Sequence, residues 1–220
     1  MINIEELPTF ILIKELFENA PSQFRKMSSL CATYLGWDNP EKSYGRSDYD
    51  IPCKMSTSAG QFIDLDSLCL RSQKKLLSLE FQHYSLGWKA MLVERVPMPS
   101  SRMILQAIEV TKGPFFNLAH SLINSKLPQW SEEKSGGISY VLGDEHANLP
   151  LSSRQKECLF YLARGKTAKH IARLLKIDHR TVETHILHVK NKLGCQTKEQ
   201  LIDKAFESGF VYFIPESLLP

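Results

Sequence analysis

The chain lacks the features that mark several common classes of protein. No apolar run approaches the roughly 18–20 residues that span a membrane, and no signal of basic, apolar and small residues opens the chain. It also has no phosphate-binding loop, no nucleophile motif and no cluster of metal ligands. These absences argue against a membrane protein and against an enzyme, and we expect neither a cofactor nor a bound metal.

Cysteine is scarce and is not arranged for cross-linking. The five cysteines are odd in number and share no short spacing. They lie at positions 31, 53, 69, 158 and 195. This pattern is typical of reduced thiols, so we expect a cytoplasmic protein without a disulfide framework.

Positive charge is concentrated in the carboxyl-terminal quarter. The whole chain has 27 Lys and Arg against 24 Asp and Glu, which gives a net charge of +3. Residues 151–208 contain twelve Lys and Arg against six Asp and Glu, so this segment carries +6 and the rest of the chain −3. Such a local basic excess is expected where a protein contacts nucleic-acid phosphates, although lysine and arginine also solvate ordinary helix surfaces.

Residues 151–202 predict four short helices joined by defined turns. Ser152 with Gln155 forms a capping-box pair at the first helix, and Thr197 with Gln200 forms another at the last. The other predicted boundaries are N-caps at Thr167 and Asp178 and stops at Gly165 and Gly194. Two short helices joined by a turn, the second with a polar face, are typical of a helix-turn-helix.

Four segments of this region match a known family in order and spacing. They read Leu-Ser-Ser-Arg at 151–154, Gly-Lys-Thr-Ala-Lys-His-Ile-Ala at 165–172, Thr-Val-Glu-Thr-His at 181–185 and Lys-Leu-Gly at 192–194. The region resembles the LuxR-type helix-turn-helix. The family usually has glutamate at the positions of Gln155 and His170, and glutamine can still complete the capping box. The resemblance implies an all-α domain of four helices that binds double-stranded DNA as a homodimer, with RNA polymerase as a further candidate partner.

Roles follow for the exposed side chains of these helices. The helix at residues 179–193 is expected to enter the major groove and to read base edges with Glu183, Thr184, Leu187 and His188. Candidate phosphate contacts are Thr167, Lys169, Arg180, Thr181, Lys190 and Lys192. Candidates for the dimer interface, or alternatively for packing within the domain, are Leu201, Ile202, Ala205 and Phe206. Glu183 has a second interpretation, because an acid in the first turn favours the positive end of a helix.

Three histidines on the same helix raise the alternative of a metal site. His179, His185 and His188 are close in sequence, and the last two are spaced to share a helix face. No cysteine pair at zinc spacing and no facing ligand accompanies them. We therefore predict no metal here.

The region before the linker predicts an α+β fold. It reads as a helical start, a short strand, a helix, an irregular segment, a second helix and a meander of three strands. The first strand and helix are expected near residues 24–28 and 29–35, and the meander over 79–85, 89–96 and 103–111. One antiparallel sheet with helices on one side is the economical arrangement.

Two turns in this region resemble those of PAS sensory domains. They are Leu-Gly-Trp at 35–37 and Tyr-Gly-Arg-Ser-Asp-Tyr-Asp-Ile-Pro at 44–52. The resemblance covers residues 10–112 and implies a module that senses a small-molecule ligand or docks another protein. In the loop, Asp48 and Asp50 are candidates for capping the next helix or orienting a ligand. A flavin-photoreactive motif is absent and His83 stands alone, so flavin and haem are not expected.

Proline and glycine accumulate between the two regions and indicate a linker. We expect a PAS-like domain at 1–127 that ends in a connecting helix, a linker at 128–150 with a brief strand over 138–142, and the helix-turn-helix domain at 151–220. The predicted function is a DNA-binding transcription regulator controlled by a signal or partner at the PAS-like domain. The alternative is a signalling adaptor whose helical domain binds protein rather than DNA.

Overall fold

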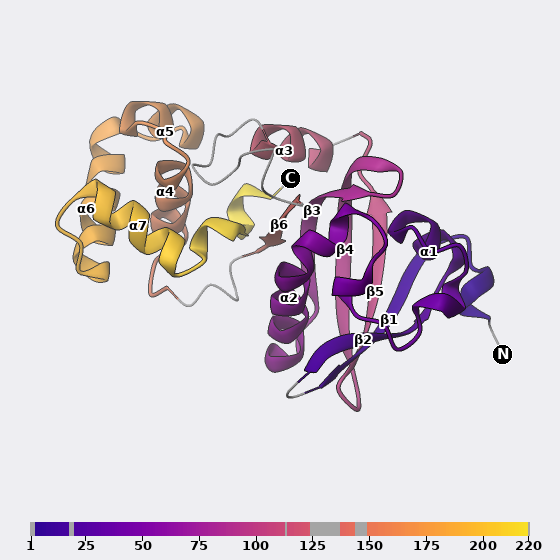
Figure 1. The fold of residues 1–220 in the computed structure, drawn as a ribbon. Coiled ribbons are helices and arrows are strands. Elements are labelled where there is room, and N and C mark those ends of the chain that lie inside the picture. The colour runs from indigo at the N-terminus through magenta and orange to yellow at the C-terminus, as the bar shows by residue number, and fades with distance from the viewer. Residues whose placement is uncertain (1–2, 18–19, 113, 124–136, 144–148, 220) are drawn as a thin grey trace. The chain divides into compact units, whose positions relative to one another are not determined.

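The computed structural model describes residues 3–17, 20–112, 114–123, 137–143 and 149–219 (Figure 1). The chain divides into two compact units. The sheet unit comprises Met1–Ala119 and Ser131–Tyr140, and the helical unit comprises His120–Trp130 and Val141–Pro220. Within the described ranges, no helix has the length and apolar character needed to cross a membrane.

An antiparallel sheet organises the sheet unit. Its strands are β1 (Phe10–Phe17), β2 (Ala20–Met27), β3 (Leu76–Tyr84), β4 (Gly87–Met98) and β5 (Arg102–Glu109). They lie in the order β2-β1-β5-β4-β3, and the neighbouring strands run antiparallel. Residues 137–140, the first part of β6 (Gly137–Leu142), follow beside β3. The predicted meander and the PAS-like α+β fold are confirmed.

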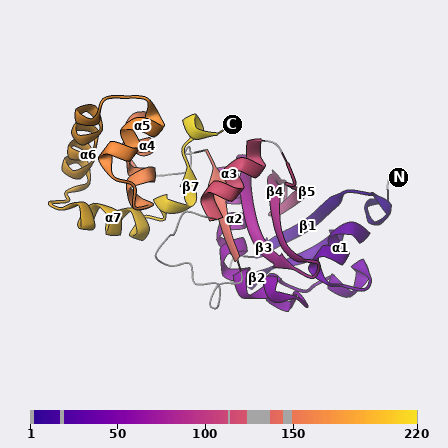
Figure 2. The ribbon, with the colours of Figure 1, turned by 90° about the horizontal axis from the view of Figure 1, so that it is seen from above.

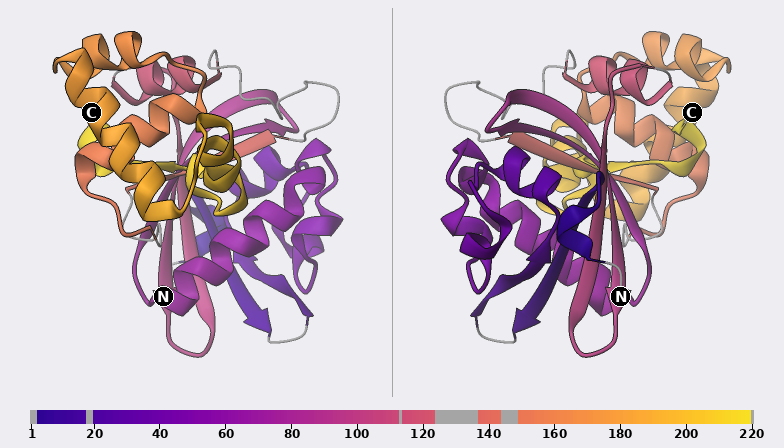
Figure 3. Two further views of the ribbon diagram at one scale, coloured as in Figure 1. Left: turned by 90° about the vertical axis from the view of Figure 1, so that its left-hand side faces the viewer. Right: turned by 90° about the vertical axis from the view of Figure 1, so that its right-hand side faces the viewer.

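Two helices cover one face of this sheet, which we call the inner face. α1 (Ser29–Leu35) begins after the N-cap Ser28 and ends at Gly36, whose φ of +87° is in the left-handed region that favours glycine. α2 (Ala59–Ser72) lies across the strands (Figure 3). Alternate residues of β4 point to this face and are buried, which gives the unit a core between sheet and helices.

The predicted helical start is limited to a 3-10 turn at Ile4–Glu6, and the first strand after it was not predicted. Residues 10–17 form β1, which pairs with β2 on one side and β5 on the other. The apolar residues of this segment are almost continuous, so their spacing distinguishes poorly between a helix and a strand. Pairing with the adjacent β2 on one edge and with the distant β5 on the other decided for the strand, and an interior strand readily carries apolar residues on both faces.

The connecting region is described in part. α3 (Pro114–Ile123) follows β5 and forms the described part of the connecting helix that was predicted to end the domain at residue 127. The strand β6 occurs where a brief strand was predicted over 138–142. The remainder of the predicted linker, residues 128–136 and 144–148, lies outside the described residues, as do residues 124–127 of the predicted helix.

Four helices build most of the helical unit: α4 (Ser153–Ala163), α5 (Ala168–Leu175), α6 (His179–Leu193) and α7 (Lys198–Glu207) (Figure 2). The predicted capping boxes at Ser152 and Thr197 and the N-caps at Thr167 and Asp178 are all confirmed. Gly165 and Gly194 have φ of +73° and +69°, which explains why α4 and α6 stop there.

A buried arginine ties the end of the chain to α4. Arg164 donates to the carbonyl oxygens of Val211 at 2.7 Å and Phe160 at 3.0 Å, and its guanidinium lies 3.5 Å from the centre of the Phe160 ring. Phe210 and Ile214 are also fully buried, and the short strand β7 (Phe213–Ile214) pairs in parallel with the end of β6. Residues beyond α7 are therefore part of the core of this unit.

Candidate nucleic-acid interface

Two helices joined by residues 176–178 form the candidate interface. α5 ends at Lys176, which has a left-handed φ of 54°, and α6 begins after Asp178, whose carboxylate accepts from the backbone N of Arg180 at 2.8 Å. Val182, Ile186 and Val189 recur at helical spacing and are buried. Because this face of α6 packs against α4 and α5, the opposite face points to solvent.

The four predicted base-reading residues share that outer face of α6. Glu183, Thr184, Leu187 and His188 are all exposed. Positions 183 and 187, and likewise 184 and 188, are one turn apart, so the four side chains form one contiguous surface. Leu187 is 52% exposed, which leaves its methyl groups free to touch an apolar group of a partner.

Two of these side chains also have partners within the helix. The hydroxyl of Thr184 donates to the backbone oxygen of Arg180 at 3.0 Å, which leaves its oxygen to accept and its methyl group outside. A carboxylate oxygen of Glu183 lies 3.5 Å from Nε2 of His179, one turn earlier. Glu183 is 55% exposed, so its carboxylate can still accept a hydrogen bond from a bound molecule.

The candidate phosphate contacts gather mainly at the starts of α5 and α6. Lys169, Arg180 and Thr181 are exposed there. Thr167 is the N-cap of α5, and its hydroxyl oxygen accepts from the backbone N of His170 at 3.3 Å. Helix N-termini attract anions through their free N–H groups and the helix dipole, so this placement suits phosphate. Lys190, in the last turn of α6, is half-buried.

Lys192 holds α6 to the start of α4, which the sequence analysis did not anticipate. Its Nζ donates to the backbone oxygen of Pro150 and to Oε1 of Gln155, both at 3.0 Å. The same Gln155 oxygen accepts from the backbone N of Ser152 at 3.0 Å and closes the capping box. Lys192 thus sets the position of the helix that carries the base-reading residues, and this structural role competes with phosphate contact.

The candidate dimer residues of α7 differ in exposure. Leu201 and Ala205 are 0% exposed, because they face the core of the helical unit. Leu201 and Ala205 therefore pack within the helical unit, which was the alternative to a dimer contact. Ile202 and Phe206 are half-buried and retain surface that a second copy could contact.

The histidines of α6 do not converge. His179 lies near Glu183, His185 is half-buried and His188 is exposed. Across the residues that the structure describes, no three His, Cys, Asp or Glu side chains are grouped so as to hold a metal ion.

A network of five buried charges occupies the interior of the sheet unit. Lys14 donates to Asp48 at 2.7 Å and to Asp66 at 2.8 Å, and Arg95 donates to Asp66 at 2.9 Å and to Glu80 at 2.7 Å. All five side chains are at most 3% exposed, and Asp66 joins the two cations. The sequence analysis missed this network. Its signal was a charged residue within each of three largely apolar strands, at positions 14, 80 and 95.

The network keeps its lysine charged despite complete burial. Burial lowers the pKa of Lys14, but the nearby Asp48 and Asp66 carboxylates outweigh that effect and raise the pKa above its ordinary value. The same balance, with Glu80 and Asp66, raises the pKa of Arg95. Buried charges persist only when they are paired in this way.

The two loop carboxylates have different roles. Asp50 accepts from the backbone N and the hydroxyl of Ser47, both at 2.8 Å, so it completes the capping box of the short 3-10 turn Asp48–Asp50, in which it lies, and does not cap a later helix. These bonds lower the pKa of Asp50. Asp48 instead belongs to the buried network, where it also accepts from the hydroxyl of Ser22 at 3.2 Å.

The space beside the network is small. The cavity has a volume of about 30 Å³ and is lined by Phe62, Tyr84 and Arg95, among others. That volume holds about two water molecules, whereas small-molecule sites measure roughly 300–1,000 Å³. A ligand in the interior would therefore have to displace side chains. His83 points away from this cavity: its Nδ1 lies 3.1 Å from the backbone oxygen of Tyr84 and its ring contacts Trp88.

Known proteins resemble this chain most clearly in the helical unit. Residues 149–205 match the family model described as bacterial regulatory proteins, luxR family. The protein SolR of Ralstonia solanacearum, named a transcriptional activator, is 34% identical over 96 residues. That match covers 43% of this chain and 35% of SolR, so the chain spans only about a third of the relative's length.

Two further relatives extend over more of their own length. YgeK of Escherichia coli K12, named an uncharacterized response regulatory protein, is 41% identical over 127 residues, which cover 53% of this chain and 83% of YgeK. Among solved structures, the VqmA dimer of Vibrio cholerae is 25% identical and covers 98% of this chain and 89% of that chain, with a TM-score of 0.47. The family model and the match to YgeK show that the chain belongs to the luxR family of bacterial regulatory proteins, and each predicted cap of its four helices is in place.

Proposed function

We propose that this protein is a cytoplasmic, non-enzymatic transcription regulator that reads DNA sequence in the major groove with α6. The observation that carries the proposal is the outer face of α6, where Glu183, Thr184, Leu187 and His188 are exposed together. The net charge of +6 over residues 151–208 supports it, because phosphate contacts supply much of the affinity for DNA.

The candidate phosphate contacts and the candidate base-reading residues have different roles in this proposal. Lys169, Arg180 and Thr181 contact phosphates and set the position of the domain without reading sequence. Glu183 accepts from the N4 amino group of a cytosine, and the apolar atoms of Thr184 and Leu187 touch a thymine methyl group. Each good contact is worth roughly 1–3 kcal/mol of discrimination against the wrong base.

Two copies of the chain would read the two halves of a symmetric site. A helix-turn-helix dimer meets half-sites about one helical turn apart, so its operator reflects the two-fold symmetry of the protein. Ile202 and Phe206 are the α7 residues with surface for a contact between the two helical units. RNA polymerase as a partner, and a small-molecule signal at the sheet unit, are further parts of this proposal.

A signalling adaptor is the second candidate. The observation that favours it is the exposure of two leucines in the helix-turn-helix, Leu174 at 43% and Leu187 at 52%. Exposed apolar side chains on neighbouring helices also suit a contact with protein. An adaptor would bind DNA weakly and without sequence preference.

Selection from a random pool of duplex DNA tests the proposal. The purified full-length protein is compared with Glu183→Ala at two salt concentrations. The matched control is Glu199→Ala, because Glu199 is also an exposed acid in the first turn of a helix, α7. We expect the wild type and the control to recover one symmetric motif, and Glu183→Ala to lose preference at one position in each half. Recovery of no motif, with binding abolished by modest salt, would favour the adaptor.

A further inference from the structure

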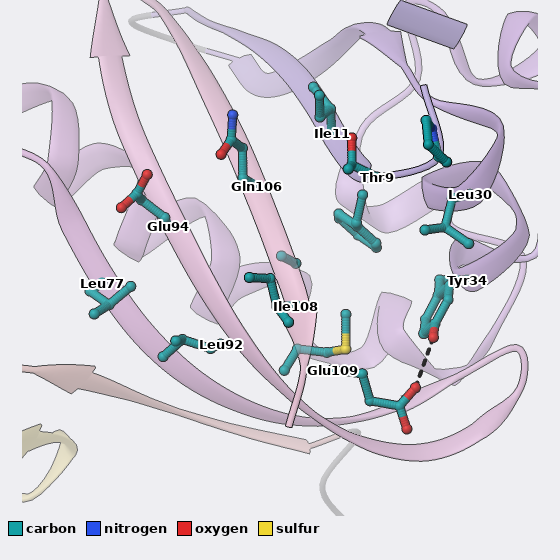
Figure 4. A pocket seen from close by; sticks show the side chains of 14 residues that line it. Thr9, Ile11, Leu30, Tyr34, Leu77, Leu92, Glu94, Gln106, Ile108 and Glu109 are labelled. Atoms are coloured by element: carbon teal, nitrogen blue, oxygen red, sulfur yellow. Dashed lines mark hydrogen bonds between the residues drawn. The ribbon is translucent and has the colours of Figure 1, made fainter. Parts of the chain in front are cut away.

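The sheet unit has a surface groove whose charged groups are already paired. The groove has a volume of about 530 Å³ and lies where β5 ends, beside α1 (Figure 4). Glu109 accepts from the hydroxyl of Tyr34 at 2.8 Å and pairs with Lys89, and Glu94 pairs with Lys75. Each carboxylate of the lining therefore has a cation of its own, and the groove presents no unpaired charge that would select a ligand.

The outer face of α6 is arranged differently, because its carboxylate is paired with a histidine. Oε1 of Glu183 lies 3.5 Å from Nε2 of His179. Among the residues that the structure describes, Glu183 pairs with this histidine and with no lysine or arginine. A neutral imidazole ring donates a single N–H, so the pair fixes one oxygen of Glu183 and leaves the carboxylate its negative charge.

His179 and Glu183 are in line along α6. Positions 179, 183 and 187 are each four residues apart, so their side chains lie one above the other on the same face of the helix. His179 is the first residue of α6 and is 48% exposed. Residues near the N-terminus of a recognition helix are the ones that reach base edges. The histidine ring therefore borders the base-reading surface.

The other neighbours of Glu183 on this face cannot replace the histidine as a donor. The hydroxyl of Thr184 already donates to the backbone oxygen of Arg180 at 3.0 Å. Leu187, one turn after Glu183, has no polar group in its side chain. The position of the Glu183 carboxylate thus depends on His179.

A glutamate without such a donor is poorly suited to reading a base. Its side chain has three rotatable bonds, and their freedom is lost when the carboxylate is held against a base edge. The phosphates on both sides of the groove also repel its charge. A donor that holds one oxygen before DNA arrives reduces the first cost, because it limits the rotamers in advance, and it offsets part of the second.

We infer that His179 is a positioning residue for base reading. Its Nε2–H holds one oxygen of Glu183, and the other oxygen accepts from the N4 amino group of a cytosine. A carboxylate has lone pairs enough for both donors. The inference rests on the proposed function, since it concerns the orientation of a residue that is proposed to read a base. Discrimination at one base position then depends on a residue that does not itself touch the base.

Binding of the full-length protein to duplexes that differ in one base pair tests the inference. The pair to vary is the one at which Glu183→Ala loses its preference in the selection. His179→Phe keeps a ring and removes the donor, so discrimination at this position should fall about threefold. His179→Gln keeps a donating N–H of similar reach, and discrimination should return close to that of the wild type.

The matched control is His170→Phe. His170 is also an exposed histidine in the first turn of its helix, α5, and it has no carboxylate partner among the residues that the structure describes. Its change should leave the discrimination at this position as in the wild type. Thermal unfolding of each variant checks that it folds, as expected for positions so exposed.

A double substitution shows whether His179 acts through Glu183. In a protein that already carries Glu183→Ala, His179→Phe should have no further effect at this position, because no carboxylate remains to be held. A persistent effect, or a loss of preference at another position, would mean that His179 reads a base itself. Unchanged discrimination in His179→Phe alone would mean that the pair is not used. Either result overturns the inference.

The pair can also be followed without DNA, which separates the inference from the proposed function. With isotope-labelled histidine nitrogens, the proton of the neutral His179 ring should favour Nε2 more strongly in the wild type than in Glu183→Ala. If the selected motif depends on Glu183 but not on His179, the inference is wrong and the regulator remains. If the ring signals show the pair but no motif is recovered, the DNA-reading function is wrong, and the inference falls with it.

Discussion

The sheet unit and the helical unit place their characteristic charges in opposite positions. In the sheet unit, Lys14, Asp66 and Arg95 are buried at the centre of a network. In the helical unit, the lysines and arginines of α5 and α6 are mostly on the surface, above an apolar core. The comparison shows that the role of exposed charges can be predicted from their spacing along the sequence. The ion-pair partners of buried charges cannot, because they come from segments that are distant in the sequence.

The largest effect is expected from breaking the buried network. Lys14→Met leaves Asp48 without a cation and Asp66 with Arg95 alone, so the free energy of unfolding of the sheet unit should fall by roughly 3–5 kcal/mol. The loss should be smaller in mildly acidic buffer, where one carboxyl can take up a proton. Urea unfolding measures it. Lys26→Met, on the neighbouring strand β2 and partly exposed, is the control, and an equal loss there would show that the network is unimportant.

Removing a lysine from the basic surface of the helical unit should lower the affinity for DNA and leave the stability of the unit unchanged. Lys169→Ala removes an exposed charge at the start of α5, so binding to all DNA sequences should weaken together. The slope of log affinity against log salt should become shallower by about 1. Titrations at several salt concentrations measure the slope, with Lys198→Ala on α7 as an exposed control. Unchanged slope and affinity for Lys169→Ala would remove this residue from the interface.

Substitution of Lys192 tests whether this residue stabilises the helical unit or contacts a DNA phosphate. Loss of its bonds to Pro150 and Gln155 should lower the stability of the helical unit by about 0.5–1.5 kcal/mol in Lys192→Ala. Lys190→Ala, two positions earlier, should weaken DNA binding with little change in stability. Chemical unfolding and DNA titration of both variants separate the effects. A stable Lys192→Ala protein with weakened DNA binding would restore its predicted role at phosphate.

The smallest effect concerns an exposed carboxylate of the sheet unit. Hydrogen bonds from the backbone and hydroxyl of Ser47 hold the pKa of Asp50 below its ordinary value of 3.8. The cap therefore contributes stability that is present above pH 3.8 and is lost as the pH falls through the lowered pKa. The melting temperature of Asp50→Ala should lie slightly below that of the wild type at neutral pH, and the two should converge in acid. Asp64→Asn, exposed on α2, should show no such convergence.

Prediction from the sequence succeeded where structure depends on near neighbours. The caps at Ser152, Thr167 and Asp178 were confirmed because each bond joins residues two or three positions apart. Helix α1 was likewise predicted with its observed bounds, from Ser28 to Gly36. The roles of the base-reading and phosphate residues remain predictions, supported by exposure.

Prediction failed where a segment had to find distant partners. The strand at residues 10–17 was not predicted, because its apolar residues follow no clear period, and pairing with the distant strand β5 as well as with β2 decided its form. The role of Asp48 was also missed, since its partner Lys14 lies 34 positions away. The burial of Leu201 and Ala205 could not be separated from an interface for the same reason.

The amino-acid sequence by itself determined the helix boundaries of the carboxyl-terminal quarter, its basic charge and its family, because caps, glycine stops and helical periodicity act within one or two turns. Only the tertiary structure decided that a lysine and an arginine share a buried aspartate, and that Lys192 holds α6 to the start of α4. These features arise when segments remote in sequence pack together, and no local pattern specifies which of them will meet.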